Sequence, residues 1–286
     1  MTALTTTAPT PAVPTSTSPA RFRDLLAAEW LKLWSLRSMR WAFGVSALAL
    51  VLLNANAALA DYDNWPGYPA LTRAYFVPGG ANGDAFSNNT GIALLLVAGS
   101  LGAVSLVNEY ATGLIRATFA AVPDRRALLT AKVAVLTAVT LVYGAVVALA
   151  SFGVSEAILS GRHAGIPIDY PGALRGIVAS ALLAPVCALT GMGLGALIRH
   201  SATTIVATVV VLLLIPNFMS NNHRWSADLY NATPFRAWQR LRDLDALGHS
   251  ANIHYPATVT GSWLVLALWP LVAVLLTLAV VHRRDL

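Results

Sequence analysis

Glu109-Tyr-Ala-Thr-Gly-Leu-Ile-Arg-Ala-Thr-Phe-Ala-Ala-Val-Pro-Asp-Arg-Arg-Ala-Leu-Leu-Thr-Ala-Lys132 is a polar segment between two long apolar runs of the chain. Charged side chains recur along it, and a charged side chain in the hydrocarbon of a membrane is costly. The segment is therefore expected to lie in water or against a protein partner. The runs on either side, residues 91–108 and 133–159, have the length and composition of membrane-spanning helices.

The composition of the whole chain is typical of a membrane protein. Of its 286 residues, 56% are hydrophobic and 11% are charged, whereas an ordinary soluble domain has about 25% charged residues. The net charge is +6, but the basic residues are scattered between apolar runs, so no nucleic-acid partner is predicted. Cys187 is the single cysteine, which excludes an intramolecular disulfide.

The predicted fold class is an all-α polytopic membrane protein with six transmembrane helices. Apolar runs of about 20 residues match a hydrocarbon core about 30 Å thick. Glycine and proline turn signals in residues 61–89 argue against a further span there. The predicted spans are residues 41–60, 91–108, 133–159, 176–198, 203–219 and 261–281, which form one six-span domain over residues 41–286.

The segments outside the spans have distinct expected roles. Residues 1–20 are rich in Thr and Pro and are predicted to be a disordered tail. Residues 21–40 are amphipathic and predicted to be a helix in the membrane interface. Residues 109–132 connect the second and third spans, and residues 220–260 form a long external loop. Within that loop, residues 234–247 have the apolar spacing of an amphipathic helix, which either lies on the outer leaflet or dips into it.

The basic residues predict the orientation in the cell membrane. Cytoplasmic segments of membrane proteins carry the excess of Lys and Arg. If the amino terminus is inside, 12 of the 19 basic residues face the cytoplasm, so both termini and residues 109–132 are predicted to be cytoplasmic. Those 12 residues are Arg21, Arg23, Lys32, Arg37, Arg40, Arg116, Arg125, Arg126, Lys132, Arg199, Arg283 and Arg284.

Catalytic and ion-conducting motifs are missing from the sequence. The predicted spans hold no ionisable residue near their centres, and Glu156 lies close to an end. A nucleotide-binding P-loop needs a lysine after a glycine-rich turn, and neither Lys32 nor Lys132 follows a glycine. The chain is therefore predicted not to be an enzyme and to hold no cofactor or metal. If ATP drives it, a partner subunit must bind the ATP.

Several short motifs, in this order, resemble the permease subunits of type-2 ABC exporters, particularly those of actinomycetes. The motifs cover nearly the whole chain apart from the tail and the outer loops. They are Ala28-Glu-Trp-Leu-Lys-Leu33, Glu109-Tyr-Ala-Thr-Gly-Leu-Ile-Arg-Ala-Thr118, Pro123-Asp-Arg-Arg126 with Ala131-Lys132, Gly193-Leu-Gly-Ala-Leu-Ile-Arg199 and Arg283-Arg-Asp285.

This resemblance implies partners and a site. It implies a dimer, with a second copy or a sister permease, in which each cytoplasmic face rests on a separate ABC ATP-binding subunit. It also implies a cytoplasmic coupling helix between the second and third spans and short re-entrant helices between the fifth and sixth, which residues 234–247 would partly supply. The implied ATPase-docking residues are Glu109, Gly113, Ile115, Arg116, Pro123, Asp124, Arg125 and Arg126.

A stiff coupling helix joined to two spans would convert movement of a docked ATPase into rocking of those spans. Glu109 and Arg116 are seven residues apart, so they are expected on one helical face, where they bracket a surface. Arg125 and Arg126 either contact the ATPase or simply retain the loop on the cytoplasmic side.

The predicted function is export of an amphipathic or hydrophobic substrate that the sequence does not specify. The alternative is a non-transporting membrane assembly or sensory subunit.

Overall fold

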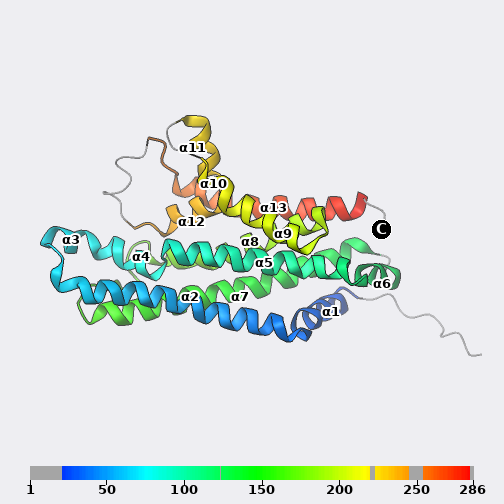
Figure 1. Cartoon of the computed structure of the whole chain (residues 1–286), viewed down its shortest axis with the longest axis horizontal. Helices are drawn as coiled ribbons and strands as arrows, with labels where there is room; N and C mark the ends of the chain where they lie inside the picture. The colour runs from blue at the N-terminus through cyan, green and yellow to red at the C-terminus, as the bar shows by residue number, and fades with distance from the viewer. Residues whose placement is uncertain (1–20, 123, 220–222, 245–253, 284–286) are drawn as a thin grey trace, which may run out of the picture.

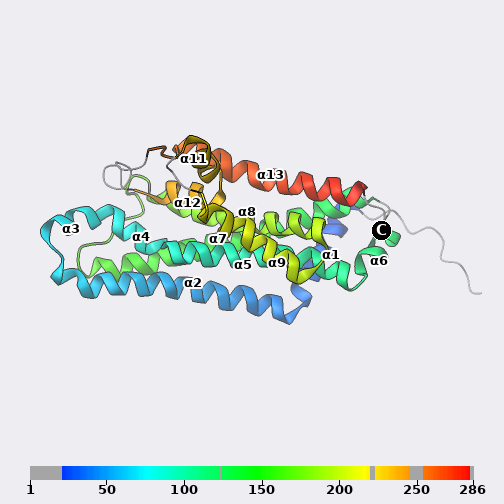
Figure 2. The same cartoon turned by 45° about the horizontal axis from the view of Figure 1, so that its top comes forward.

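The computed structural model describes residues 21–122, 124–219, 223–244 and 254–283. These residues form helices and connecting turns, and none of them is in a strand. The long helices run side by side in an elongated bundle (Figures 1 and 2). They are α2 (Arg37–Asn64), α5 (Asn88–Ala111), α7 (Arg125–Ser160), α8 (Ala173–Ile198) and α13 (Val259–Arg283).

Shorter helices lie at the two ends of the bundle and along one side. They are α1 (Phe22–Ser35), α3 (Ala70–Tyr75), α4 (Ala81–Ala85), α6 (Leu114–Ala121), α9 (Ser201–Val209), α10 (Ile215–Asn217), α11 (Arg224–Asn231) and α12 (Pro234–Arg242). A 3-10 turn, η1 (Trp65–Gly67), and a π-helical turn, η3 (Val210–Leu214), join some of them. Segment η2 (Phe76–Gly80) is a kink between α3 and α4, in which Val77 has a non-helical backbone. Residues 61–89, predicted to be a loop, thus contain several short helices.

Five helical stretches in the described part of the chain are long and apolar enough to cross a membrane. The fold is therefore that of an all-α protein of the membrane-spanning class, in agreement with the predicted class. The five stretches, which include the predicted first to fourth and sixth spans, are Arg37–Gly67, Ala81–Ala111, Arg125–Ser160, Ala173–Ile198 and Val259–Val281.

The predicted fifth span is a shorter apolar helix, Ser201–Asn217, built from α9, η3 and α10. Its length at an α-helical rise is about 25 Å, less than the roughly 30 Å of a hydrocarbon core. The π-helical turn η3 interrupts the α-helical pattern in its middle. The segment packs along α5 and leads from the α6 end of the bundle towards α11 (Figures 1 and 2). The count of six spans remains a prediction.

Helix α8 is the centre of the bundle, and α5, α7, α12 and α13 pack around it. Small residues let the backbones approach closely. A Cβ atom added at Gly102 of α5 would overlap the carbonyl oxygen of Ala188 in α8, and one added at Gly144 of α7 would overlap that of Ala181. The core of the molecule is thus held by backbone proximity as well as by large apolar side chains.

The two ends of the bundle carry different elements. Helix α1, helix α6 and the carboxyl end of α13 lie at one end, which we call the α6 end (Figure 1). Helices α3, α4, α11 and α12 lie at the other, the α12 end (Figures 1 and 2). The interfacial helix predicted over residues 21–40 corresponds to α1 for most of its length, but α1 ends at Ser35 and residues 37–40 form the start of α2. Helix α1 lies at the same end of the bundle as α6 (Figure 1). The predicted tail, residues 1–20, lies outside the described residues.

Helix α12 confirms the amphipathic helix predicted from residue 234, although it ends at Arg242, and residues 245–247 lie outside the described part of the chain. It packs against α8 and α13. The buried Trp238 donates a hydrogen bond from Nε1 to Ser180 Oγ at 2.9 Å. Because its apolar face is covered by protein, α12 forms part of the bundle at this end.

Candidate functional site: a buried ion cluster at the α6 end

The polar segment of residues 109–132 is divided among three helices. Helix α5 continues through Glu109 to Ala111, α6 is a separate short helix, and α7 begins at Arg125. Between α5 and α6, Gly113 has a φ of 69°, a left-handed conformation that glycine adopts without steric cost. The prediction that Glu109 and Arg116 share one helical face is therefore wrong, because this turn separates their helices.

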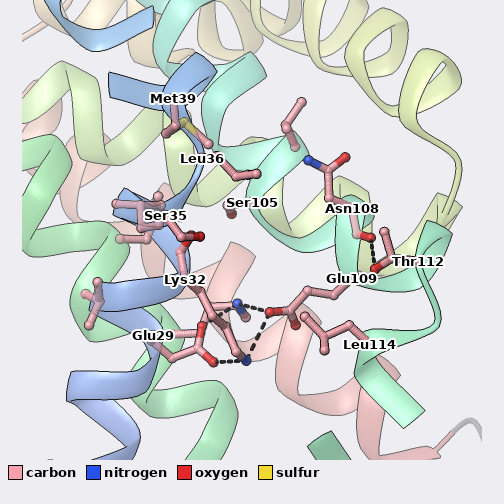
Figure 3. Close-up of a pocket in the computed structure, with 15 residues that line it drawn as sticks. Glu29, Lys32, Ser35, Leu36, Met39, Ser105, Asn108, Glu109, Thr112 and Leu114 are labelled. Atoms are coloured by element: carbon pink, nitrogen blue, oxygen red, sulfur yellow. Dashed lines mark hydrogen bonds and ion pairs between the residues drawn. The ribbon is translucent and has the colours of Figure 1, made fainter. Parts of the chain in front are cut away.

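Four charged side chains from α1, α5 and α7 meet at this end of the bundle. The Nζ atom of Lys132 lies 2.5 Å from Glu29 Oε2 and 2.9 Å from Glu109 Oε1. The Nζ atom of Lys32 lies 2.6 Å from Glu29 Oε1 and 3.2 Å from Glu109 Oε1. Figure 3 shows Glu29, Lys32 and Glu109 converging on one another. Two ammonium groups and two carboxylates thus alternate in a four-residue ion cluster with no net charge.

The ion cluster is almost completely removed from solvent. The exposed fraction of the side chain is 3% for Glu29, 8% for Glu109 and 7% for Lys132, but 28% for Lys32. Burial by itself lowers the pKa of Lys32, but hydrogen bonding and attraction by Glu29 and Glu109 outweigh it and raise that pKa above its ordinary value. A buried charge is tolerated only with close partners, and every member of this cluster has two.

A pocket of about 460 Å³ opens beside the ion cluster (Figure 3). Its wall combines the charged groups with apolar side chains such as Leu33, Leu36 and Val104. A more open groove of about 560 Å³ runs from it between α2 and α5 and shares Leu36 and Val104 with it. The groove carries scattered polar groups, including Ser46 and Ser100. This combination of an apolar wall and a polar end suits an amphipathic molecule.

In the described ranges of the chain, no group of three or more His, Cys, Asp or Glu side chains is placed to hold a metal ion. The ion cluster contains acids and amines that neutralise one another. These ion pairs connect α1 to the ends of α5 and α7, the two long helices that flank α6.

The predicted docking residues do not form one exposed surface. Glu109 belongs to the ion cluster, and Ile115 is 2% exposed and packs among Leu106, Leu129 and other side chains of α5, α7 and α8. Both side chains are therefore buried and make their contacts with other residues of this chain. Gly113 forms the turn into α6. Pro123 and the side chain of Arg116 lie outside the described part of the structure.

The remaining three predicted docking residues lie at the start of α7. Asp124 caps the helix, and its Oδ1 accepts hydrogen bonds from the backbone N–H groups of Arg126 at 3.1 Å and Ala127 at 3.0 Å. The guanidinium carbon of Arg125 lies 5.2 Å from the centre of the Phe119 ring, which fixes this side chain against α6. Arg126 is exposed. Arg125 and Arg126 thus lie next to α6, at the end of the bundle.

The ion cluster itself is not predicted from the sequence, where Glu29, Lys32 and Lys132 occur within motifs but have no expected partner. A signal was present in the composition. Lys32 and Lys132 are the only lysines of the chain, and Glu29 and Glu109 are two of its three glutamates. Charges that are this rare, and that stand next to apolar runs, are candidates for pairing with one another.

Comparisons with known proteins add no family to this description. A scan against known protein families finds none that matches the chain, and a search of curated proteins finds no match either.

Proposed function

We propose that this chain is the permease subunit of an ATP-driven exporter. A separate ABC ATP-binding subunit docks at the α6 end, and the chain moves an amphipathic or hydrophobic molecule across the cell membrane. A second copy or a sister permease completes the transporter. The chain itself binds no ATP, since it has no P-loop lysine.

The observation that carries this proposal is the packing of α6 against the ends of α5 and α7, which the ion cluster in turn connects to α1. Helix α6 lies between the ends of α5 and α7, and Ile115 anchors it in the apolar cluster that those helices share with α8. The ion cluster then joins the same two ends to α1. A force applied to α6 by a docked subunit therefore reaches α1, α5 and α7 together, which is what rigid-body coupling requires.

The groove between α2 and α5 supports a transport function. It adjoins the pocket beside the ion cluster and extends along two of the membrane-spanning candidates. Its opening lies beside exposed apolar side chains of α2, such as Val45 and Leu48. An amphipathic molecule in the surrounding lipid would reach the groove sideways. Rocking of α5 relative to α2 would then change its width.

The proposed orientation places the α6 end in the cytoplasm. The basic residues predicted to be cytoplasmic belong to the segments that begin or end there, including Arg37, Arg125 and Arg199. Cytoplasmic boundaries of membrane proteins carry this excess of positive charge. The docking surface of the proposal is formed by α6 with the half-buried Arg125 and the exposed Arg126.

The test is copurification of an ATP-binding protein with the tagged full-length chain from its native cells, at equal membrane levels. Arg125→Glu with Arg126→Glu reverses two charges next to α6. Arg73→Glu with Arg224→Glu is the matched control, because both arginines are exposed at the α12 end. Bound subunits are identified by photo-crosslinking to an azido-ATP analogue.

We expect an ATP-binding protein with the wild type and with the control pair, and its loss with Arg125→Glu and Arg126→Glu. Reversing two charges at a docking surface is expected to weaken binding by about tenfold or more. If no ATP-binding protein is captured even after crosslinking in intact membranes, the exporter proposal fails. The alternative, a non-transporting assembly or sensory subunit, would then take its place.

A further inference from the structure

A second pocket, of about 710 Å³, lies at the α12 end. One wall is formed by η2 and the residues before it, including Tyr75 and Phe76. The other wall is formed by α12 and the residue after it, with Arg236, Gln239 and Arg242. We call it the arginine pocket. It belongs to the opposite end of the bundle from the ion cluster and shares no residue with that site.

The two guanidinium groups of the arginine pocket are held in place by a chain of amides. Arg242 Nη2 donates to Asn88 Oδ1 at 2.8 Å, and Gln239 Nε2 donates to the same oxygen at 2.9 Å. Arg236 Nη1 donates to Gln239 Oε1 at 3.4 Å. Arg242 Nη1 also donates to the carbonyl oxygen of Phe86. These acceptors, two side-chain amides and one backbone carbonyl, are neutral, so they position the two arginines without neutralising their charge.

Aromatic rings support the same two side chains. The guanidinium carbon of Arg242 lies 4.8 Å from the centre of the Trp238 ring, and that of Arg236 lies 5.4 Å from the centre of the Tyr230 ring. Such cation–π contacts restrict the motion of a cation while leaving its edge able to donate hydrogen bonds. Two immobilised forks lose little further entropy when a ligand binds, which favours affinity.

The arginine pocket has an excess of positive charge. Its described lining contains two guanidinium groups and one carboxylate, that of Asp243. Arg175 of α8 adds a further cation behind it, with Nη2 donating to the backbone oxygen of Asp243 at 2.7 Å. Within the described residues, the Nε atoms of Arg236 and Arg242 are buried and have no hydrogen-bond partner. Burial lowers the pKa of Arg242 to about 10, with the nearby Asp243 opposing that shift, so the group is still protonated at neutral pH.

We propose that the arginine pocket binds a phosphate group. A phosphate presents several oxygens to planar guanidinium forks and accepts paired hydrogen bonds from them. Gly79 in the facing wall has no side chain, which leaves room for a headgroup beyond the phosphate itself, whereas the space beside Gly80 is filled by the Phe76 ring. Tyr75 and Phe76 supply an apolar surface for the rest of the ligand.

The position of the pocket is compatible with two sources of phosphate. One wall runs from the residues after the first membrane-spanning candidate into the start of the second, and the other wall precedes the last candidate, so the pocket lies where the spans end. Phosphates of lipid headgroups occupy this depth of a bilayer. A soluble phosphate in the surrounding water would reach the same place. The inference does not depend on the docking of an ATPase at the other end.

The test is native mass spectrometry of the full-length chain in a neutral detergent with three separate probes. They are inorganic phosphate, a short-chain phosphatidylglycerol and the matching diacylglycerol, which lacks the phosphate. Binding of inorganic phosphate identifies a soluble source as sufficient, whereas binding of phosphatidylglycerol alone identifies a lipid. If neither phosphate compound binds, or if diacylglycerol binds as tightly as phosphatidylglycerol, the proposal is wrong.

Single variants connect the binding to the two arginines. Arg236→Gln and Arg242→Gln are each expected to weaken binding of the phosphate probe by about tenfold or more, since each loses charged hydrogen bonds. Arg224→Gln removes the same charge from an exposed position on α11 and is expected to bind as the wild type does. Arg242→Gln also loses the hydrogen bond to Phe86 and could unfold this end of the bundle. Arg236 has a single long hydrogen bond, to Gln239, so Arg236→Gln is the decisive variant if Arg242→Gln is unstable. Unchanged binding in Arg236→Gln overturns the proposal.

Discussion

Lys132→Met removes the ammonium group that lies 2.5 Å from Glu29 and 2.9 Å from Glu109, while it keeps most of the length of the side chain. The two carboxylates are then left with Lys32 alone. The ion cluster changes from neutral to a net charge of −1 in a region where both glutamates are nearly inaccessible to water. The variant therefore tests whether the cluster holds α1, α5 and α7 together.

The expected loss can be set from burial. Removing one partner of a buried ion pair destabilises a protein by about 3–5 kcal/mol, because the other charge is left uncompensated. Lys32→Met removes the most exposed member, at 28% exposure, and is expected to lower the free energy of unfolding by only about 1–2 kcal/mol because water reaches this position. Lys132→Met with Glu29→Gln leaves the neutral pair of Lys32 and Glu109. The double variant is therefore expected to be more stable than Lys132→Met alone.

The assay is unfolding by SDS in mixed micelles, followed with a thiol-reactive fluorescent dye. Cys187 is the only cysteine of the chain and is fully buried in α8, so it reacts when the bundle opens. The free energies of the wild type, both lysine variants and the double variant form one comparison. If Lys132→Met costs less than about 1 kcal/mol, or if the double variant is less stable than Lys132→Met, the electrostatic explanation of this end of the bundle is refuted.

Two further predictions concern packing and protonation. Gly102→Ala should lower the free energy of unfolding by about 1–3 kcal/mol, because the added methyl group overlaps the backbone of Ala188. Gly44→Ala should raise it by about 0.5–1 kcal/mol, because the added methyl group meets nothing within 4 Å and alanine favours a helix. The same dye assay measures both. The hydrogen bond to Asp61 raises the pKa of Tyr68 to about 12, so the stability that this bond contributes is complete below pH 10 and is lost as the pH rises through about 12. In absorbance titrations, Asp61→Asn should move this phenol back towards its ordinary pKa of about 10, and an unchanged titration curve would contradict the assignment.

Much of the fold follows from patterns that are local in the chain. Five of the predicted spans lie within long apolar helices, since about 20 apolar residues are enough to specify such a helix wherever it packs. The helix from residue 234 was visible for a similar reason, because apolar residues at three- and four-residue spacing define one face. The fifth predicted span, residues 203–219, is already the shortest of the six and matches the observed helix Ser201–Asn217 in length. The π-helical turn inside it does not follow from hydropathy.

The candidate site was only partly predictable. The importance of residues 109–132 was indicated by their charges, but the break at Gly113 was missed, and Glu109 was assigned to an exposed surface. Glu109 and Lys132 were identified as charged members of one segment. Their partners in α1, Glu29 for Lys132 and Lys32 for Glu109, are far from both in the sequence. No spacing rule relates residues that meet only when separate helices pack.

The sequence by itself determined the all-α class, the apolar helices and the positions of the charges, because hydrophobicity and helical periodicity act within a single helix. Tertiary structure alone decided which charges face inward. It brought Glu29, Lys32, Glu109 and Lys132 into one neutral cluster, and it turned Arg236 and Arg242 towards one pocket. The physical reason is that charge pairing depends on distances of a few ångströms between side chains on different helices, and no pattern within one helix specifies those distances.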